Sequence, residues 1–135
     1  MKGTHSEPRP AEAIKDLETA LKDPRVEYKR AYVSTDLTEL RMAFPDDASF
    51  AKAVLAVVRE IKVALGDPAK YGKPLSRKLK GLRRGAFTPL DSRHACLRLV
   101  AEPVKHGGIR IYAFRHRHQP PGPYIVAGDR ALRRR

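Results

Sequence analysis

The hydrophobic positions of the first 45 residues predict a helix, a strand and a second helix in turn. Three apolar residues at helical spacing indicate a short helix over 11–21, which ends at Asp23-Pro24 because proline cannot continue a helix. Valine and tyrosine among charged residues over 26–33 favour a strand with one solvent-facing side. The Ser-Thr-Asp run at 34–36 supplies N-cap candidates for a short helix whose apolar stripe is Leu37, Leu40 and Phe44.

The clearest helix in the pattern begins at Asp46 and Asp47 and ends at Gly66. Its apolar residues repeat at intervals of three and four, and the two carboxylates meet the positive end of the helix dipole. The following segment, 67–90, is polar and basic and is interrupted by glycine and proline. We therefore expect mostly loop there, with one helical turn near 75–79.

The rest of the chain has the pattern of a sheet. Residues 94–101 and 109–114 read as strands, and the turn at 105–108 suits a hairpin connection. After a proline-rich break at 119–123, the segment 124–127 fits either the end of a strand or the start of a last helix, and the arginines at 133–135 are expected to form a solvated tail. This order predicts an α+β domain with helices on one face of a mostly antiparallel sheet.

Composition limits the class of protein. With 135 residues and 41% hydrophobic content, one compact domain is expected. The longest apolar run, Ala53 to Val58, is too short for a membrane span or for the usual core of a signal peptide, so we expect a cytoplasmic protein without membrane contact. The single cysteine, Cys96, excludes an intrachain disulfide and a zinc site of several thiolates.

Charge is distributed unevenly between the two halves of the chain. Residues 1–68 hold 11 Lys and Arg against 12 Asp and Glu, whereas 69–135 hold 17 Lys and Arg against only three acids, a net charge of +14. Such a concentration of positive charge favours a polyanionic partner, because neutralising phosphates releases condensed counterions. Nucleic acid is the favoured partner, and an acidic protein that holds the basic protein off its target is compatible with it.

A succession of motifs over 75–130 resembles the RelE/ParE superfamily of toxins from type II toxin–antitoxin systems. The motifs are Lys78-Leu79-Lys80-Gly81, Leu97-Arg98-Leu99-Val100, the strand 109–114 running into Arg115-His116-Arg117, and Pro123-Tyr124 followed by Ala127 and Arg130. The resemblance implies a small RelE-like fold over 26–135, with two helices packed on a twisted, mostly antiparallel sheet and a concave basic surface opposite. Residues 1–25, a disordered arm over 1–10 and the short helix, are an addition to that outline.

The resemblance also implies a function. RelE-like toxins cleave mRNA in the ribosomal decoding site without a metal or other cofactor, whereas the ParE-like branch acts on DNA gyrase and lacks the nuclease side chains. A ribosome-dependent mRNA endoribonuclease held by a cognate acidic antitoxin is the first hypothesis. A ParE-like gyrase inhibitor and a non-catalytic basic nucleic-acid-binding protein are the alternatives.

Site residues follow from the matching positions. Arg98 and Arg117 match the family's phosphate-stabilising arginines. Tyr124 matches the family's tyrosine that transfers a proton or orients the substrate, and His118, with His116, could donate a proton as histidine does in some members. The chemistry agrees, because arginine stabilises a phosphorane with a permanent charge. The family's lysines on the strand before Arg98 have no counterpart here, which leaves the general base unassigned. Backbone phosphates would contact Lys78, Lys80, Arg83, Arg84, Arg93 and Arg115.

These residues also have purely structural interpretations. Arg98 can be the solvent-facing residue of its strand, and the Tyr124 ring can pack against the core while its hydroxyl contacts water. The pairs His94/Cys96 and His116/His118 lack further ligands at suitable spacing, so no metal site is expected.

Overall fold

A computed structural model describes residues 7–134, so most of the arm expected at 1–10 lies outside the described residues. The helices are α1 (Pro10–Leu21), α2 (Arg30–Ala43), α3 (Asp47–Gly66) and α4 (Pro123–Arg134), with short 3₁₀ turns η1 (Pro68–Lys70), η2 (Arg77–Leu79) and η3 (Lys105–Gly107). The strands are β1 (Val26–Glu27), β2 (Lys73–Pro74), β3 (Arg83–Phe87), β4 (Leu97–Val104) and β5 (Gly108–His116). The expected α+β class is confirmed.

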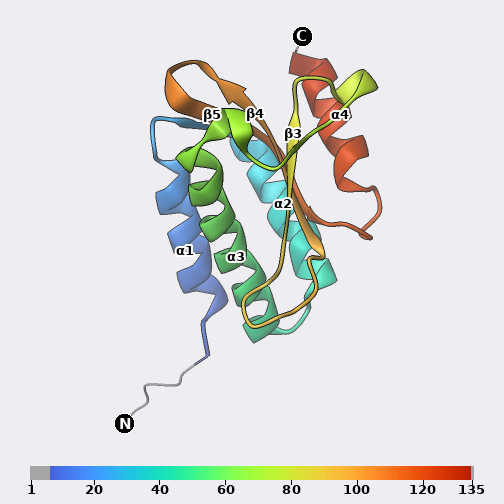
Figure 1. The fold of residues 1–135 in the computed structure, drawn as a ribbon. Coiled ribbons are helices and arrows are strands. Elements are labelled where there is room, and N and C mark those ends of the chain that lie inside the picture. Colours follow the sequence, from blue (N-terminus) through green and yellow to red (C-terminus); the bar gives the residue numbers. More distant parts are fainter. Residues whose placement is uncertain (1–6, 135) are drawn as a thin grey trace.

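One mixed sheet of five strands runs through the molecule in the order β1-β5-β4-β3-β2 (Figure 1). Three of its four pairings are antiparallel, and β1 pairs with β5 in parallel. Both edge strands are only two residues long. None of the helices within 7–134 combines the length and apolar character that crossing a bilayer requires.

The larger part of the core lies between the sheet and α3. Phe50, Val54 and Ile61 of α3 are buried in the same cluster as Leu99 and Phe114 of the sheet. α1 lies against α3, as Figure 1 shows, and adds Ala13 and Leu17 to this cluster. The apolar stripe of the first helix therefore covers a neighbouring helix, and that helix in turn covers the sheet.

The opposite face of the sheet is covered by α4, which corrects the expectation of helices on one face only. A second buried cluster joins Val126 and Ala127 of α4 to Val100, Tyr112 and Ala113 of the central strands. The register explains how β5 contributes two consecutive residues to it: Ile111 pairs with Ala101 and Ala113 pairs with Val100, which leaves Tyr112 as the extra residue of a β-bulge. The concave basic surface expected on this side is thus occupied in part by a helix.

The strand expected over 26–33 is wrong beyond Glu27, because α2 begins at Arg30. The hydroxyl of Thr35 donates to the carbonyl of Ala31 at 3.0 Å, so the Ser-Thr-Asp run lies inside the helix and does not cap it. The valine- and tyrosine-rich pattern here is overridden by tertiary packing, since β-propensity mostly reflects burial against neighbours.

Two other expectations are settled by the structure. The loop expected over 67–90 contains β3, which pairs with β4 along five residues, although the helical turn near 75–79 is confirmed as η2. Residues 124–127, for which the sequence left strand and helix open, belong to the start of α4. Arg133 and Arg134 are exposed, as expected, but they end this helix, and Arg135 lies outside the described residues. The long helix is confirmed as α3, with the Asp46 side chain accepting from the Ser49 amide at 2.9 Å.

Candidate active site

A pocket of about 550 Å³ lies where β4 begins and β5 ends. We call it the histidine pocket. The Arg117 amide donates to the Cys96 carbonyl at 2.8 Å, which extends the pairing of the two strands and holds the residues after β5 beside those before β4. The polar and titratable side chains at its lining are Ser49, Lys52, Asp91, Ser92, His94, Cys96, His116, Arg117 and His118, and Phe44, Pro89 and Leu90 are apolar.

Hydrogen bonds orient His116 and His118, the two histidines that flank Arg117 in the sequence. The Arg117 Nε donates to Nε2 of His118 at 2.9 Å, and the His118 amide donates to Nδ1 of His116 at 3.1 Å. Each imidazole nitrogen named here accepts; in His116 the accepting atom is Nδ1, so the neutral form of this ring carries its proton on Nε2. The ring centroids of His116 and His118 are 5.8 Å apart, and Phe44 lies 5.9 Å from His116 on the other side.

The pKa directions in the pocket follow from burial and from positive charge. Burial lowers the pKa of His116 below its ordinary value, and the positive charges of His118, Arg117 and Arg98 lower it further. The pKa of the Cys96 thiol is raised by burial, against a smaller opposing effect of Arg117 and Arg98. At neutral pH the pocket therefore offers a neutral imidazole as a proton acceptor and a thiol that stays protonated.

Three of the four residues expected to be catalytic come together here. Arg117 and His118 line the histidine pocket, and Arg98 is close enough for its charge to act on both His116 and Cys96. Arg98 Nη1 donates to the carbonyls of Ala95 at 2.6 Å and Leu97 at 2.9 Å, which fixes its guanidinium near the start of β4. Within residues 7–134 no group of three or more His, Cys, Asp or Glu side chains is arranged to hold a metal ion.

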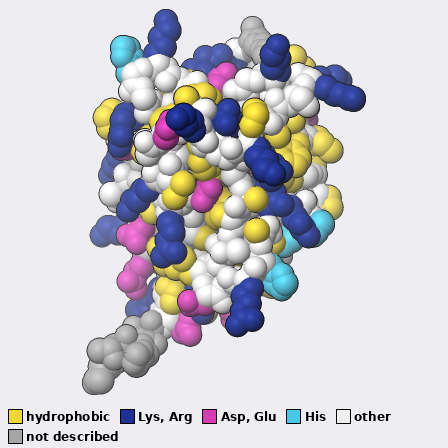
Figure 2. Space-filling view, in the orientation of Figure 1, with side chains coloured by type: hydrophobic (Ala, Val, Ile, Leu, Met, Phe, Trp, Pro, Cys, Tyr) yellow, Lys and Arg dark blue, Asp and Glu magenta, His cyan; other side chains and the backbone are white. Residues whose placement is uncertain are grey.

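Tyr124, the fourth expected catalytic residue, lies in a different depression. It lines a groove between η2 and α4 together with Lys78, Ile125 and Leu132. Ile125 and Leu132 are 63% and 70% exposed, so the groove has an apolar wall on the outer side of the helix. Figure 2 shows hydrophobic side chains gathered at the upper right, where α4 lies in Figure 1, with Lys and Arg around them.

The residues expected to bind phosphates differ in their surroundings. Lys78, Lys80 and Arg93 are exposed, whereas Arg83 and Arg84 of β3 are half-buried. The Arg83 Nε donates to the Tyr71 carbonyl at 2.6 Å, so the fork of this arginine is partly engaged by the backbone.

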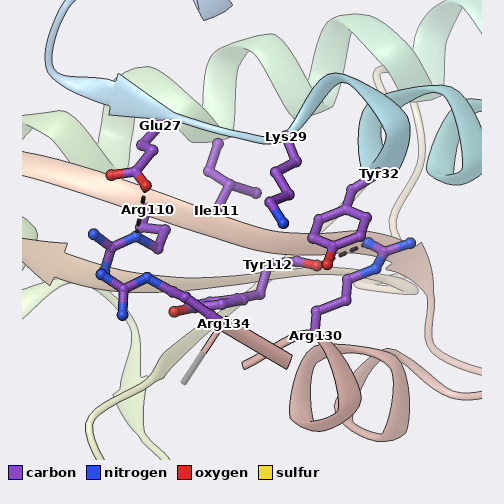
Figure 3. Close-up of a pocket in the computed structure, with 8 residues that line it drawn as sticks. All are labelled: Glu27, Lys29, Tyr32, Arg110, Ile111, Tyr112, Arg130 and Arg134. Carbon is purple, nitrogen blue, oxygen red and sulfur yellow. Dashed lines mark hydrogen bonds and ion pairs between the residues drawn. The ribbon is translucent and has the colours of Figure 1, made fainter. Parts of the chain in front are cut away.

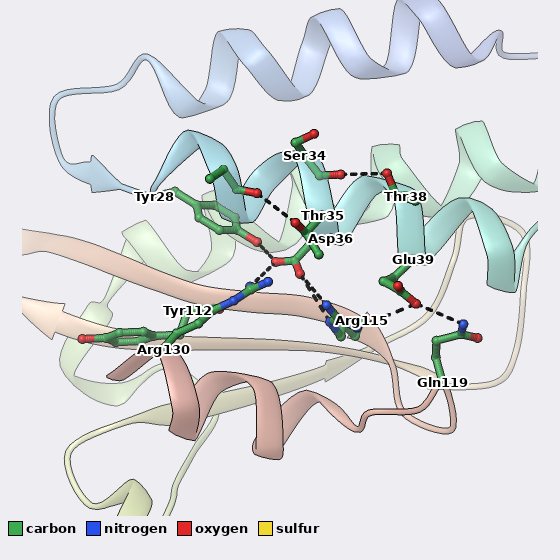
Figure 4. Close-up of polar contacts among 11 residues, drawn as sticks. Tyr28, Ser34, Thr35, Asp36, Thr38, Glu39, Tyr112, Arg115, Gln119 and Arg130 are labelled. Carbon is green, nitrogen blue, oxygen red and sulfur yellow. Dashed lines mark hydrogen bonds and ion pairs between the residues drawn. The ribbon is translucent and has the colours of Figure 1, made fainter. Parts of the chain in front are cut away.

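Arg115 is the expected phosphate ligand whose placement the structure corrects. Its side chain is 3% exposed and pairs with Asp36 of α2, whose own side chain is 0% exposed (Figure 4). Arg130 of α4 donates to the other Asp36 oxygen and to the Tyr112 carbonyl, both at 2.8 Å. Tyr28 donates its hydroxyl to the same carboxylate. Arg115 therefore joins β5 to α2 and has no path to a phosphate.

This buried network also reaches the loop that carries the histidine pocket. Glu39, one turn after Asp36 on α2, lies 3.9 Å from Arg115 and accepts from the Gln119 side chain at 3.3 Å. Gln119 follows directly after His118, so α2 holds the loop from behind (Figure 4).

Sequence reasoning missed the roles of Asp36 and Tyr28. One signal was present: Asp36 occupies the apolar stripe of α2, three residues after Val33 and four before Leu40, where a charge is found only if it is paired.

Comparison with known proteins adds no relative. No protein-family model, no curated protein and no solved structure matches this chain. The residues of the histidine pocket and the distribution of charge are therefore the features that bear on function.

Proposed function

We propose that this protein is a RelE-like toxin that cleaves mRNA on the ribosome by metal-free attack of the 2′-OH, and that an acidic antitoxin restrains it. The supporting observation is the gathering of two arginines and two oriented histidines, Arg98, Arg117, His116 and His118, around one pocket. The excess of positive charge in residues 69–135 supports an RNA substrate and an acidic partner.

The arginines answer the first requirement of the reaction. As the 2′-oxygen attacks phosphorus, negative charge builds on the nonbridging oxygens, and preorganised cations lower the energy of that state. Arg117 lies at the mouth of the pocket with its Nε on His118, which leaves the rest of its fork for a phosphate. Arg98, held by two backbone carbonyls, presents its charge from the strand side.

The histidines answer the second requirement, the two proton transfers. The 2′-OH proton goes to Nδ1 of His116, which gives up its hydrogen bond from the His118 amide; the lowered pKa keeps this ring neutral beforehand, and the bond from phosphorus to the 5′-oxygen breaks as a 2′,3′-cyclic phosphate forms. His118 gives the 5′-oxygen its proton from Nε2, which takes up that proton when Arg117 turns from this nitrogen to the phosphate. The two ring centroids are 5.8 Å apart, a contact distance for aromatic rings, so the phosphate lies beside the pair, within reach of both. His116 thereby takes the role of the general base that the sequence left unassigned.

Tyr124 has a positioning role in this proposal. Its groove along α4 also contains Lys78, so a strand leaving the histidine pocket would meet a cation and an aromatic ring there.

The deciding experiment is primer extension on an mRNA that purified ribosomes are translating. We expect discrete cuts with the wild-type protein and a loss of about 10²-fold or more with Arg117→Ala or His116→Ala. Arg59→Ala is the matched control, since it removes an exposed cation of α3 outside the pocket lining. Tyr124→Phe should reduce the rate less than Arg117→Ala does.

The alternatives are outcomes of the same experiment. If the folded wild-type protein makes no cut, the nuclease proposal is wrong, and a gyrase supercoiling assay then tests ParE-like inhibition. Non-catalytic nucleic-acid binding is favoured by one observation of its own, the exposed cations Lys78, Lys80 and Arg93 outside the histidine pocket. It predicts salt-dependent RNA binding that His116→Ala leaves unchanged.

A further inference from the structure

A second, smaller pocket lies at the other end of β5, where the start of α2 and the end of α4 approach the strand (Figure 3). Its volume is about 60 Å³. Counting about 3.3 Å per residue from Arg110 to His116, it is about 20 Å from the histidine pocket. We call it the arginine pocket; its polar lining is Glu27, Lys29, Tyr32, Tyr112, Arg110, Arg130 and Arg134.

Two of its four cations are already paired in part. The Arg110 Nε donates to Glu27 at 3.0 Å and its Nη1 to Glu102 at 2.7 Å. Arg130 uses Nη1 for Asp36, while its guanidinium lies 4.3 Å from the centroid of the Tyr32 ring. These contacts fix both guanidinium groups rigidly at the floor of the pocket.

The other two cations, Lys29 and Arg134, form no ion pair at salt-bridge distance within residues 7–134, although the charge of Arg134 contributes to lowering the pKa of Glu27. Lys29 lies 5.5 Å from the Tyr32 ring centroid, and both Lys29 and Arg134 are exposed at the rim. The first turn of α2 also begins here, with no acidic residue and no side-chain cap, so its dipole adds positive potential.

We propose that the arginine pocket binds a phosphate group. Arg130 supplies a fixed guanidinium at the floor, and Lys29 and Arg134 close on the ligand from two different elements. A phosphate dianion matches this arrangement because its oxygens accept from several donors at once and its charge matches two unpaired cations. The small volume fits a single phosphate group, such as the one at the end of a nucleic-acid strand whose remainder lies outside the pocket, and excludes a duplex. This inference is independent of the proposed cleavage.

The test is a titration of the ¹⁵N-labelled full chain at constant ionic strength, followed by NMR at the Arg130 Nε–H and the Tyr32 amide. The probes are inorganic phosphate, a 5′-phosphorylated deoxytrinucleotide and the same trinucleotide with a 5′-hydroxyl. Deoxy probes have no 2′-OH, so the histidine pocket cannot cleave them. We expect saturable shifts with both phosphate probes and much weaker ones with the 5′-hydroxyl strand.

Variants complete the test. Lys29→Gln with Arg134→Gln should weaken binding of the phosphorylated probe by at least about tenfold, and Arg134→Lys should keep it within about threefold. The control pair, Arg30→Gln with Arg133→Gln, removes the same charge from neighbouring positions outside the pocket lining and should change binding less than about twofold.

Each outcome bears on the proposal. Equal weakening in the two pairs of variants, equal affinity for the phosphorylated and 5′-hydroxyl strands, or shifts that avoid Arg130 and Tyr32 would overturn it. Equal affinity for inorganic phosphate and the phosphorylated strand supports the site and identifies free phosphate as its ligand. If the double variant does not fold, the single Arg134→Gln variant at an exposed position decides.

Discussion

Replacing Asp36 by asparagine tests the structural network most directly. The carboxylate is the only side chain that contacts both Arg115 and Arg130 in the buried part of the network described for residues 7–134, and it is fully buried. The substitution keeps the shape and one acceptor but removes the charge, so Arg130 loses its counter-ion and Arg115 keeps only Glu39, at 3.9 Å, in a region of low dielectric constant. One nitrogen, Nη1 of Arg115, already has no hydrogen-bond partner there.

The expected loss follows from that geometry. Breaking a buried ion pair by removing one partner costs about 3–5 kcal/mol, because the other charge stays buried and uncompensated. We expect the free energy of unfolding of Asp36→Asn to fall by about this amount. For a domain of this size, with a urea m-value of about 2 kcal/mol/M, the midpoint should fall by about 2 M.

Urea unfolding followed by circular dichroism measures the loss, and Glu39→Gln is the matched control. Glu39→Gln removes the same charge from the same helix, but the Glu39 side chain is 24% exposed and 3.9 Å from Arg115. The free energy of unfolding should therefore change by less than about 1 kcal/mol. Replacing Asp36, Arg115 and Arg130 together by Leu, Met and Met should recover most of the loss. Equal shifts for Asp36→Asn and Glu39→Gln would refute this account of the network.

Three further predictions concern other parts of the molecule. Gly85→Ala should lower the unfolding free energy by about 2 kcal/mol or more, since the new Cβ would overlap the hydroxyl and the ring of Tyr71; a thermal melt beside Gly66→Ala, where the new Cβ meets nothing within 4 Å, checks this. The single-turnover cleavage rate should stay constant as the pH falls to about 6.5 and decline only below it, because the lowered pKa of His116 keeps its imidazole free to accept a proton. A decline in the rate that begins above pH 7 would argue against His116 as the base. Ile125→Thr and Leu132→Gln should each change stability by less than about 0.5 kcal/mol in urea, and a larger loss would mean that the α4 groove is packed within the chain.

Much of the fold could be predicted from local patterns. α1 and α3 have regular apolar stripes, and the hairpin of β4 and β5 has alternating residues around a glycine turn, so short-range periodicity was enough. β3 was missed because its sequence, Arg-Arg-Gly-Ala-Phe, has little strand character of its own and forms by pairing with β4. The start of α2 was missed because its valine and tyrosine suited a strand equally well.

In the candidate site, too, contacts between sequence neighbours could be predicted, whereas contacts with distant residues could not. Arg117 and His118 are adjacent in sequence, so their meeting with His116 could be predicted from the strand end alone. The burial of Arg115 could not, because its partner Asp36 is 79 residues away, and Arg130 is 94 residues from the same carboxylate. On a strand, Arg115 has the same local pattern as Arg98, and only the path of α2 along β5 distinguishes a buried ion pair from a surface cation.

The two-residue edge strands of the sheet affect how readily the protein aggregates at high concentration. A long, flat margin would invite a strand of another molecule to add to it and begin aggregation. Here the β2 margin is made of Lys73 and Pro74, a charge and a residue without an amide hydrogen, which suit neither close approach nor continued pairing. The protein is thereby protected, at this margin, against stacking into fibrils.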